Sequence, residues 1–211
     1  MIPRRNLLGW LLAGTAGVTL APRHLAADSR EGNDGEWLDA IARRRHKAFL
    51  DIRGFAADGT PFRKAANLHR ALTEAHGARA DEVGIAFGAG SSSIAYVLGE
   101  GIWEEYRVGV KVAGAARDAE EARSLAAEPK RWAAAHGEEI RGMLAKEMRV
   151  LACRNSLWRW ARDFAAVTGE APERVNEKLI AGLHKGVEPV PAMIAAAVLA
   201  QGRGLSYVAI E

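Results

Sequence analysis

The fold is decided by a short apolar run that ends in the only cysteine of the chain, Met148-Arg149-Val150-Leu151-Ala152-Cys153-Arg154-Asn155-Ser156-Leu157-Trp158. The run up to Cys153 has the length and composition of a buried strand, and a helical pattern follows at once. A strand that turns directly into a helix presents its last side chain at the carboxyl edge of a sheet. In open α/β folds ligands bind at that edge. Cys153 is therefore the first candidate for a functional residue.

Strands and helices alternate on both sides of this segment. The patterns predict strands over 48–52, 81–87, 106–112, 150–153, 187–190 and 206–210. They predict helices near 37–41, from Pro61, and over 115–127, 129–145, 154–168, 172–183 and 191–201. Such alternation is typical of a mostly parallel sheet covered on both faces. We expect a three-layer α/β/α domain with about five or six strands.

The strand at 106–112 is predicted from alternation alone. Tyr106 and three valines, Val108, Val110 and Val112, alternate there with polar residues or glycine. Alternation over this length indicates a half-exposed strand.

Length and charge limit the classes of protein. The chain has 211 residues, of which 49% are hydrophobic, enough for one domain with a core that needs no disulfides. The net charge is +3, but residues 1–27 contain Arg4, Arg5 and Arg23 and no acidic residue. Without them the chain has 26 basic and 26 acidic residues. The basic character belongs to the N-terminal segment, so we expect no nucleic-acid partner.

The N-terminal segment resembles a bacterial export signal. It begins with Arg4 and Arg5, continues with an apolar stretch to Leu20 and ends in small residues at Ala26 and Ala27. Paired arginines indicate the twin-arginine route, which exports folded proteins. A helical N-terminal arm or an uncleaved anchor is the alternative. We expect a signal peptide over 1–27, a linker over 28–35, one domain over 36–211, and a periplasmic protein that meets the membrane only through this signal.

A single cysteine is unusual in an exported domain, because an oxidising compartment favours pairs. Cys153 has three possible states: buried and inert, paired between chains, or used in chemistry.

A glycine-serine turn is expected at the same sheet edge, in Phe87-Gly88-Ala89-Gly90-Ser91-Ser92-Ser93. Glycines between a strand and a helix can bind a phosphate. However, the segment lacks the lysine of a P-loop and the third glycine of the dinucleotide fingerprint. A tight turn with serine helix caps is the simpler interpretation. Gly88, Gly90 and Ser91 are nevertheless candidates for lining a pocket shared with Cys153.

The histidines do not have the spacing of a metal site. Beyond residue 27 they are scattered at positions 46, 69, 76, 136 and 184, without the paired spacing of zinc ligands. We therefore expect no metal and no other cofactor.

Three motifs in the last sixty residues resemble the DsrE/DsrF-like family of sulfur-relay proteins. In that family a strand ends in Cys-x-Asn-[Thr/Ser]-Leu, a Gly-Val-x-x-Val-Pro segment opens the last helix, and Gln-x-x-Gly-x-x-Tyr enters the last strand. The corresponding residues are Cys153–Leu157, Gly186–Pro191 and Gln201–Tyr207. The resemblance covers roughly 146–211 and is looser at the first strand, the first helix and the glycine turn.

The resemblance implies a compact domain that assembles into trimers or hexamers. The best-known members pass sulfane sulfur between partner proteins as a cysteine persulfide. The persulfide carrier here would be Cys153, with its thiolate favoured by a helix N-terminus and by Arg154. Asn155 would fix the loop or form a hydrogen bond with a sulfur adduct. The partners would be a sulfur donor and a sulfur acceptor.

The chain departs from the family in three respects. Where the family turn often carries histidine, in His-Gly-x-Gly, this chain has Phe87. The 100–130 region is longer and more aromatic than in the family, with Trp103 and Tyr106, so it could cover the cysteine or form an oligomer contact. The family's sulfur-transfer members work in the cytoplasm, whereas we expect this chain to be exported. Two functions therefore stay open, with enzymatic activity undecided: a periplasmic sulfur carrier or sulfurtransferase-like protein, and a non-catalytic module for ligand binding or assembly that keeps only the fold.

Overall fold

The computed structural model describes residues 35–211 of the chain. They belong to one compact unit. The strands are β1 (His46–Ile52), β2 (Val83–Ala89), β3 (Arg149–Cys153), β4 (Val187–Val190) and β5 (Ser206–Ile210). They form one sheet in the order β4-β3-β2-β1-β5, and every pair is parallel. The predicted α/β class with a parallel sheet is confirmed. The predicted signal peptide and almost all of the predicted linker lie outside the described residues.

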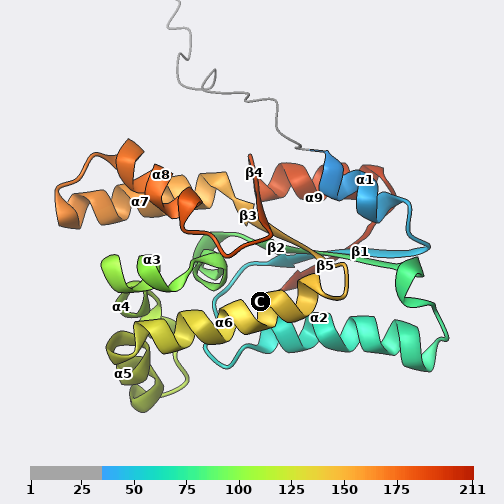
Figure 1. Cartoon of the computed structure of the whole chain (residues 1–211), viewed down its shortest axis with the longest axis horizontal. Coiled ribbons are helices and arrows are strands. Elements are labelled where there is room, and N and C mark those ends of the chain that lie inside the picture. The colour runs from blue at the N-terminus through green and yellow to red at the C-terminus, as the bar shows by residue number, and fades with distance from the viewer. Residues whose placement is uncertain (1–34) are drawn as a thin grey trace, which may run out of the picture. The chain divides into compact units, whose positions relative to one another are not determined.

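Helices flank the sheet on both faces (Figure 1). They are α1 (Glu36–Ala42), α2 (Thr60–Arg70), α3 (Glu100–Glu105), α4 (Val108–Val112), α5 (Ala119–Ala127), α6 (Pro129–Leu144), α7 (Arg154–Thr168), α8 (Pro172–Ala181) and α9 (Met193–Gly202). In Figure 1, α1 and α9 lie on one side of the sheet, and α2 and α6 lie on the other. In the part of the chain that is described, no helix is both long enough and apolar enough to span a membrane.

The sheet separates two hydrophobic cores. The smaller core joins α1 and α9 to the sheet and includes Trp37, Phe49 and Leu151. The larger core lies against the other face and takes in side chains of α2, α6 and α7, such as Phe62 and Trp160. Successive residues of a strand point to opposite faces of the sheet. In β3, Leu151 and Cys153 therefore belong to the smaller core, and Val150 and Ala152 belong to the larger one.

The register brings the carboxyl ends of the strands together at one edge. Ile52 at the end of β1 pairs with Ala89 of β2 and with Ile210 of β5, and Cys153 at the end of β3 pairs with Val190 of β4. α7 follows β3 into the larger core, whereas α9 follows β4 into the smaller one. The chain thus leaves two neighbouring strands toward opposite faces. Such a switch point opens a crevice at the carboxyl edge.

Residues 106–112 do not form the predicted strand. α4 spans Val108–Val112, with Val108 and Val112 buried and Val110 exposed. Valines at every second position also place two of them four residues apart, on one face of a helix. Gly109 lets this helix pack closely on α5, since a Cβ there would lie 1.7 Å from the Leu125 carbonyl oxygen. The sheet therefore has five strands among the described residues, not six.

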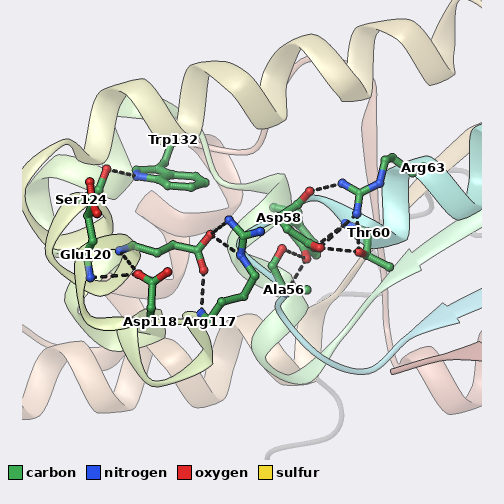
Figure 2. A network of polar contacts seen from close by, with 11 residues as sticks. Ala56, Asp58, Thr60, Arg63, Arg117, Asp118, Glu120, Ser124 and Trp132 are labelled. Atoms are coloured by element: carbon green, nitrogen blue, oxygen red, sulfur yellow. Dashed lines mark hydrogen bonds and ion pairs between the residues drawn. The ribbon is translucent and has the colours of Figure 1, made fainter.

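Polar contacts fix the loop after β1 and the start of α5 (Figure 2). The Asp58 carboxylate accepts hydrogen bonds from the Thr60 N–H and hydroxyl, at 2.9 and 2.8 Å, and from Arg63 at 3.0 Å. The bonds from Thr60 are the main cause that lowers the pKa of Asp58 to about 2. At the start of α5, Asp118 accepts hydrogen bonds from two backbone N–H groups of the first turn, as a helix cap does.

Candidate functional site

A solvent-open cavity of about 610 Å³ lies at the carboxyl edge of the sheet. Its walls come from the ends of β1 and β3, from the turn after β2, from β5, from the first turn of α7 and from α9. Four of the residues predicted for the site line it together: Cys153, Asn155, Gly90 and Ser91. The sheet edge expected from the sequence is therefore the place where these residues meet.

Cys153 lies at the start of two helices. It occupies the N-cap position of α7, and its Sγ accepts a hydrogen bond from the backbone N–H of Met193, the first residue of α9, at 3.4 Å. The residue is 5% exposed, and it is a free thiol. Helix N-termini favour negative charge, because their first N–H groups lack partners within the helix. The Cys153 side chain makes no capping hydrogen bond to α7, so its hydrogen bond at a helix start is the one with α9.

The glycine-serine turn is held by serine hydroxyls. Ser93 Oγ accepts a hydrogen bond from the Gly90 N–H at 2.9 Å, and Ser156 Oγ accepts one from the Ser91 N–H at 2.8 Å. A 3₁₀ helix, Ser91–Val97, follows. Because these two N–H groups have partners within the protein, they are not presented to a phosphate. Ser91 has a φ of 52°, an uncommon conformation for a residue with a side chain.

Gly88 and Arg154 do not line the cavity. Gly88 lies within β2 beneath α9, and a Cβ there would come within 2.5 Å of Met193 Sδ. Its part is to let α9 approach the sheet. Arg154 is exposed and is not among the cavity residues. Of the predicted site residues, Gly88 and Arg154 are thus the two that do not line this cavity.

Three cavity residues that sequence reasoning missed form a hydrogen-bonded cluster. Tyr207 on β5 donates from its hydroxyl to Asp51 Oδ2 on β1 at 2.6 Å. Arg53, just after β1, donates to the Tyr207 hydroxyl at 2.9 Å and to Asp51 Oδ2 at 3.2 Å. The bond to Asp51 is the main cause that raises the pKa of Tyr207. Tyr207 therefore stays a neutral donor near pH 7. The sequence signal that could have pointed to this cluster is Asp51 itself, an acidic residue at the end of an otherwise apolar strand.

The wall formed by α9 is mostly apolar, with Gln201 as its polar residue, and it is uncovered. Met193, Ile194, Ala197 and Val198 line the cavity from this helix. Ile194 is 78% exposed and Val198 is 63% exposed. The helix is apolar on nearly all sides, and such a pattern predicts a helix that is buried all round. The exposed face of α9 could therefore not be identified from the sequence.

The aromatic residues of 100–130 do not cover the cysteine. No residue of this region lines the cavity. Trp103 is buried in the larger core and donates from its indole N–H to the Ala95 carbonyl at 3.0 Å. Phe87, at the position of the family's histidine, also belongs to that core and stacks on Phe62 with ring centroids 5.3 Å apart. A side chain at position 87 therefore lies on the opposite face of the sheet from the cavity.

Comparisons with known proteins give no family for this chain. No protein-family model and no curated protein sequence matches it.

Proposed function

We propose that the protein is a sulfur carrier or sulfurtransferase-like protein that holds sulfane sulfur on Cys153. The observation that carries the proposal is the position of this thiol. It lies at the start of α7, accepts a hydrogen bond from the first N–H of α9 and lines an open cavity. The resemblance of the motifs around it to DsrE/DsrF-like proteins supports the same chemistry.

The reaction is a displacement at sulfur. The Cys153 thiolate attacks the outer sulfur of a donor R–S–SH, and a bond forms between Sγ and that sulfur. The S–S bond of the donor breaks, and R–S⁻ leaves with the electron pair and takes a proton from water. Cys153 then holds a persulfide, and no net oxidation occurs. Attack by a thiolate on divalent sulfur is the general reaction of thiol-disulfide exchange.

The direct test is the intact mass of the mature protein after incubation with inorganic polysulfide. We expect added sulfur in the wild type, removable by a reducing agent, and none in Cys153→Ser. The substitution is a matched control, because Cys153 is the only cysteine of the chain. An unchanged wild-type mass, in a protein whose native thiol also resists alkylation, contradicts the proposal.

A second candidate is a non-catalytic module that binds a small ligand. The cavity volume and the cluster of Asp51, Tyr207 and Arg53 on its wall favour it. The binding module predicts a function that survives Cys153→Ser, whereas the carrier predicts loss of function in that variant. A complementation assay with Cys153→Ser separates the two.

We also propose export through the N-terminal arginine pair. The mature protein would then begin at Asp28 in the periplasm, and changing Arg4 and Arg5 to lysine would leave the precursor in the cytoplasm. Cell fractionation with N-terminal sequencing tests this. An uncleaved wild-type chain in the cytoplasm contradicts it.

Assembly into trimers or hexamers is the remaining proposal. Leu199 on α9 is 56% exposed, and β5 is an edge strand with Val208 exposed on it. Exposed apolar side chains and an open sheet edge are features of surfaces that associate.

A further inference from the structure

The cavity beside Cys153 has a composition that selects among sulfur donors. We infer that its substrate is a small organic hydropersulfide, R–S–SH, with an apolar chain and an amide or amine end, rather than an inorganic anion such as thiosulfate. The inference rests on the proposed sulfur chemistry of Cys153 and adds the class of donor to it. It is carried by the volume, the charges and the two unlike walls of the cavity.

Volume is the first argument. A cavity of about 610 Å³ falls within the range of about 300–1,000 Å³ that holds organic ligands of moderate size. A five-atom ion such as thiosulfate would leave most of this space to water. An organic donor can extend from the thiol along the cavity and displace that water.

Charge is the second argument. Arg53 is the only cationic residue of the cavity lining, all of which lies in the described part of the chain. Its guanidinium already lies 3.2 Å from Asp51 and 3.7 Å from Glu211. A dianion entering the cavity would meet the Asp51 carboxylate without gaining an unpaired cation in the lining. Arg159 contacts Ser91 at 3.4 Å, but it is exposed and is not a lining residue.

The third argument is the contrast between the walls. On α9, Ile194 and Val198 present exposed apolar side chains to the cavity. On the sheet side, Asp51 Oδ2 receives both bonds of the cluster, from Tyr207 and Arg53. Its Oδ1 is therefore the atom that can accept a bond from a ligand N–H. A ligand with methylene groups at one end and an N–H at the other can pack against the apolar side chains of α9 and donate a hydrogen bond to Asp51 at the same time.

Sulfur transfer from this donor has the balance given above: Sγ gains the outer sulfur, and R–S⁻ leaves and is protonated by water. The apolar wall would hold R while the thiolate attacks. The organic thiol then leaves the cavity, which regenerates space for the acceptor.

The test uses two donors and one neutral substitution. 6-Aminohexyl hydropersulfide, whose methylene chain ends in an amine, and thiosulfate are each reacted with the mature wild type and with Val198→Asn, and the initial rate of sulfur addition to Cys153 is measured by mass. Comparing the rates within one donor cancels the difference in intrinsic reactivity between donors. Val167→Asn is the matched control, because Val167 lies on α7, is 87% exposed and does not line this cavity.

We expect Val198→Asn to slow addition from 6-aminohexyl hydropersulfide about tenfold, the effect of losing contact with about two methylene groups. Addition from thiosulfate should stay within about twofold, since little of that ion touches the apolar wall. Val167→Asn should change neither rate. Equal effects on both donors, or no effect on the organic donor, overturn the inference and leave the carrier function standing.

Binding is measured separately with 6-(methylthio)hexylamine, a thioether that cannot transfer sulfur. Calorimetry should show binding to the wild type and to Cys153→Ser, and weaker binding to Val198→Asn. If no donor adds sulfur but this binding pattern holds, the carrier function fails and the ligand class stands. If the thioether does not bind, the ligand class is contradicted whatever the donors do. Circular dichroism verifies folding, and Ile194→Asn replaces Val198→Asn if that variant unfolds.

Discussion

The space around the Cys153 thiol is left open by Gly90. A Cβ on residue 90 would lie 3.8 Å from Cys153 Cβ and 3.6 Å from Met193 Cβ, which is ordinary contact, and the φ of −138° suits any residue. Gly90→Ala should therefore fold normally and crowd the thiol. We expect alkylation of native Cys153 by iodoacetamide to slow several-fold.

A matched control for Gly90→Ala is Gly142→Ala. Gly142 lies in α6, and a Cβ there meets nothing within 4 Å. Gly142→Ala should stabilise the protein by roughly 0.5–1 kcal/mol, because alanine favours the helix, and it should leave the alkylation rate of Cys153 unchanged. Equal alkylation rates in the Gly90→Ala variant and the wild type would show that reagents reach the thiol by another route.

His136 should make stability depend on pH. It is buried among the rings of Phe55, Tyr96 and Trp103, and neither of its ring nitrogens has a hydrogen-bond partner among the described residues. Burial lowers its pKa from 6.5 to about 3, with a further contribution from His184. Below pH 6.5 the unfolded chain binds a proton that the folded chain does not bind. The free energy of unfolding should therefore fall between pH 6.5 and about 3.

Urea denaturation at several pH values measures this dependence. The His136 contribution has a slope of at most about 1.4 kcal/mol per pH unit, and His136→Phe should remove it. His184, whose pKa is also lowered by burial, and Asp58, whose pKa is lowered to about 2, contribute to the slope that remains in this variant. An identical pH dependence in wild type and His136→Phe would mean that His136 is not held neutral.

At the scale of elements, packing decides what the pattern at 106–112 becomes. The spacing of its valines fits a strand and a helix equally, and the packing of α4, including the contact of Gly109 with α5, selects the helix. Gly109→Ala should cost roughly 3 kcal/mol, because its methyl group would overlap the Leu125 carbonyl. Chemical denaturation measures this loss. Gly114→Ala, where a Cβ meets nothing within 4 Å, is the control, and equal stability of the two variants would contradict the packing.

Most of the other elements could be predicted from the sequence. The strand before Cys153 and the helix after it have strong local patterns, and the parallel sheet follows from their alternation. The cluster at the cavity could not be predicted, because Asp51 and Tyr207 are 156 residues apart. They meet only because β5 pairs with β1, at the opposite edge of the sheet from β4. Local sequence patterns do not predict which strand β5 will pair with.

For the whole molecule, light scattering of the mature protein should give the mass of a trimer or hexamer. Leu199→Glu should lower that mass, because it places a charge on the exposed face of α9 outside the cavity. Val167→Glu, at another exposed helix position, should not change the mass. A wild-type protein that stays monomeric at micromolar concentration contradicts the proposed assembly.

The central claim is that Cys153 holds transferable sulfur. The most direct measurement is the sulfane sulfur released by cyanide from protein that has been loaded with polysulfide and then desalted. The account predicts thiocyanate from the wild type, in proportion to the amount of protein, and none from Cys153→Ser. Absence of thiocyanate from the folded wild type, or equal release from Cys153→Ser, would contradict it.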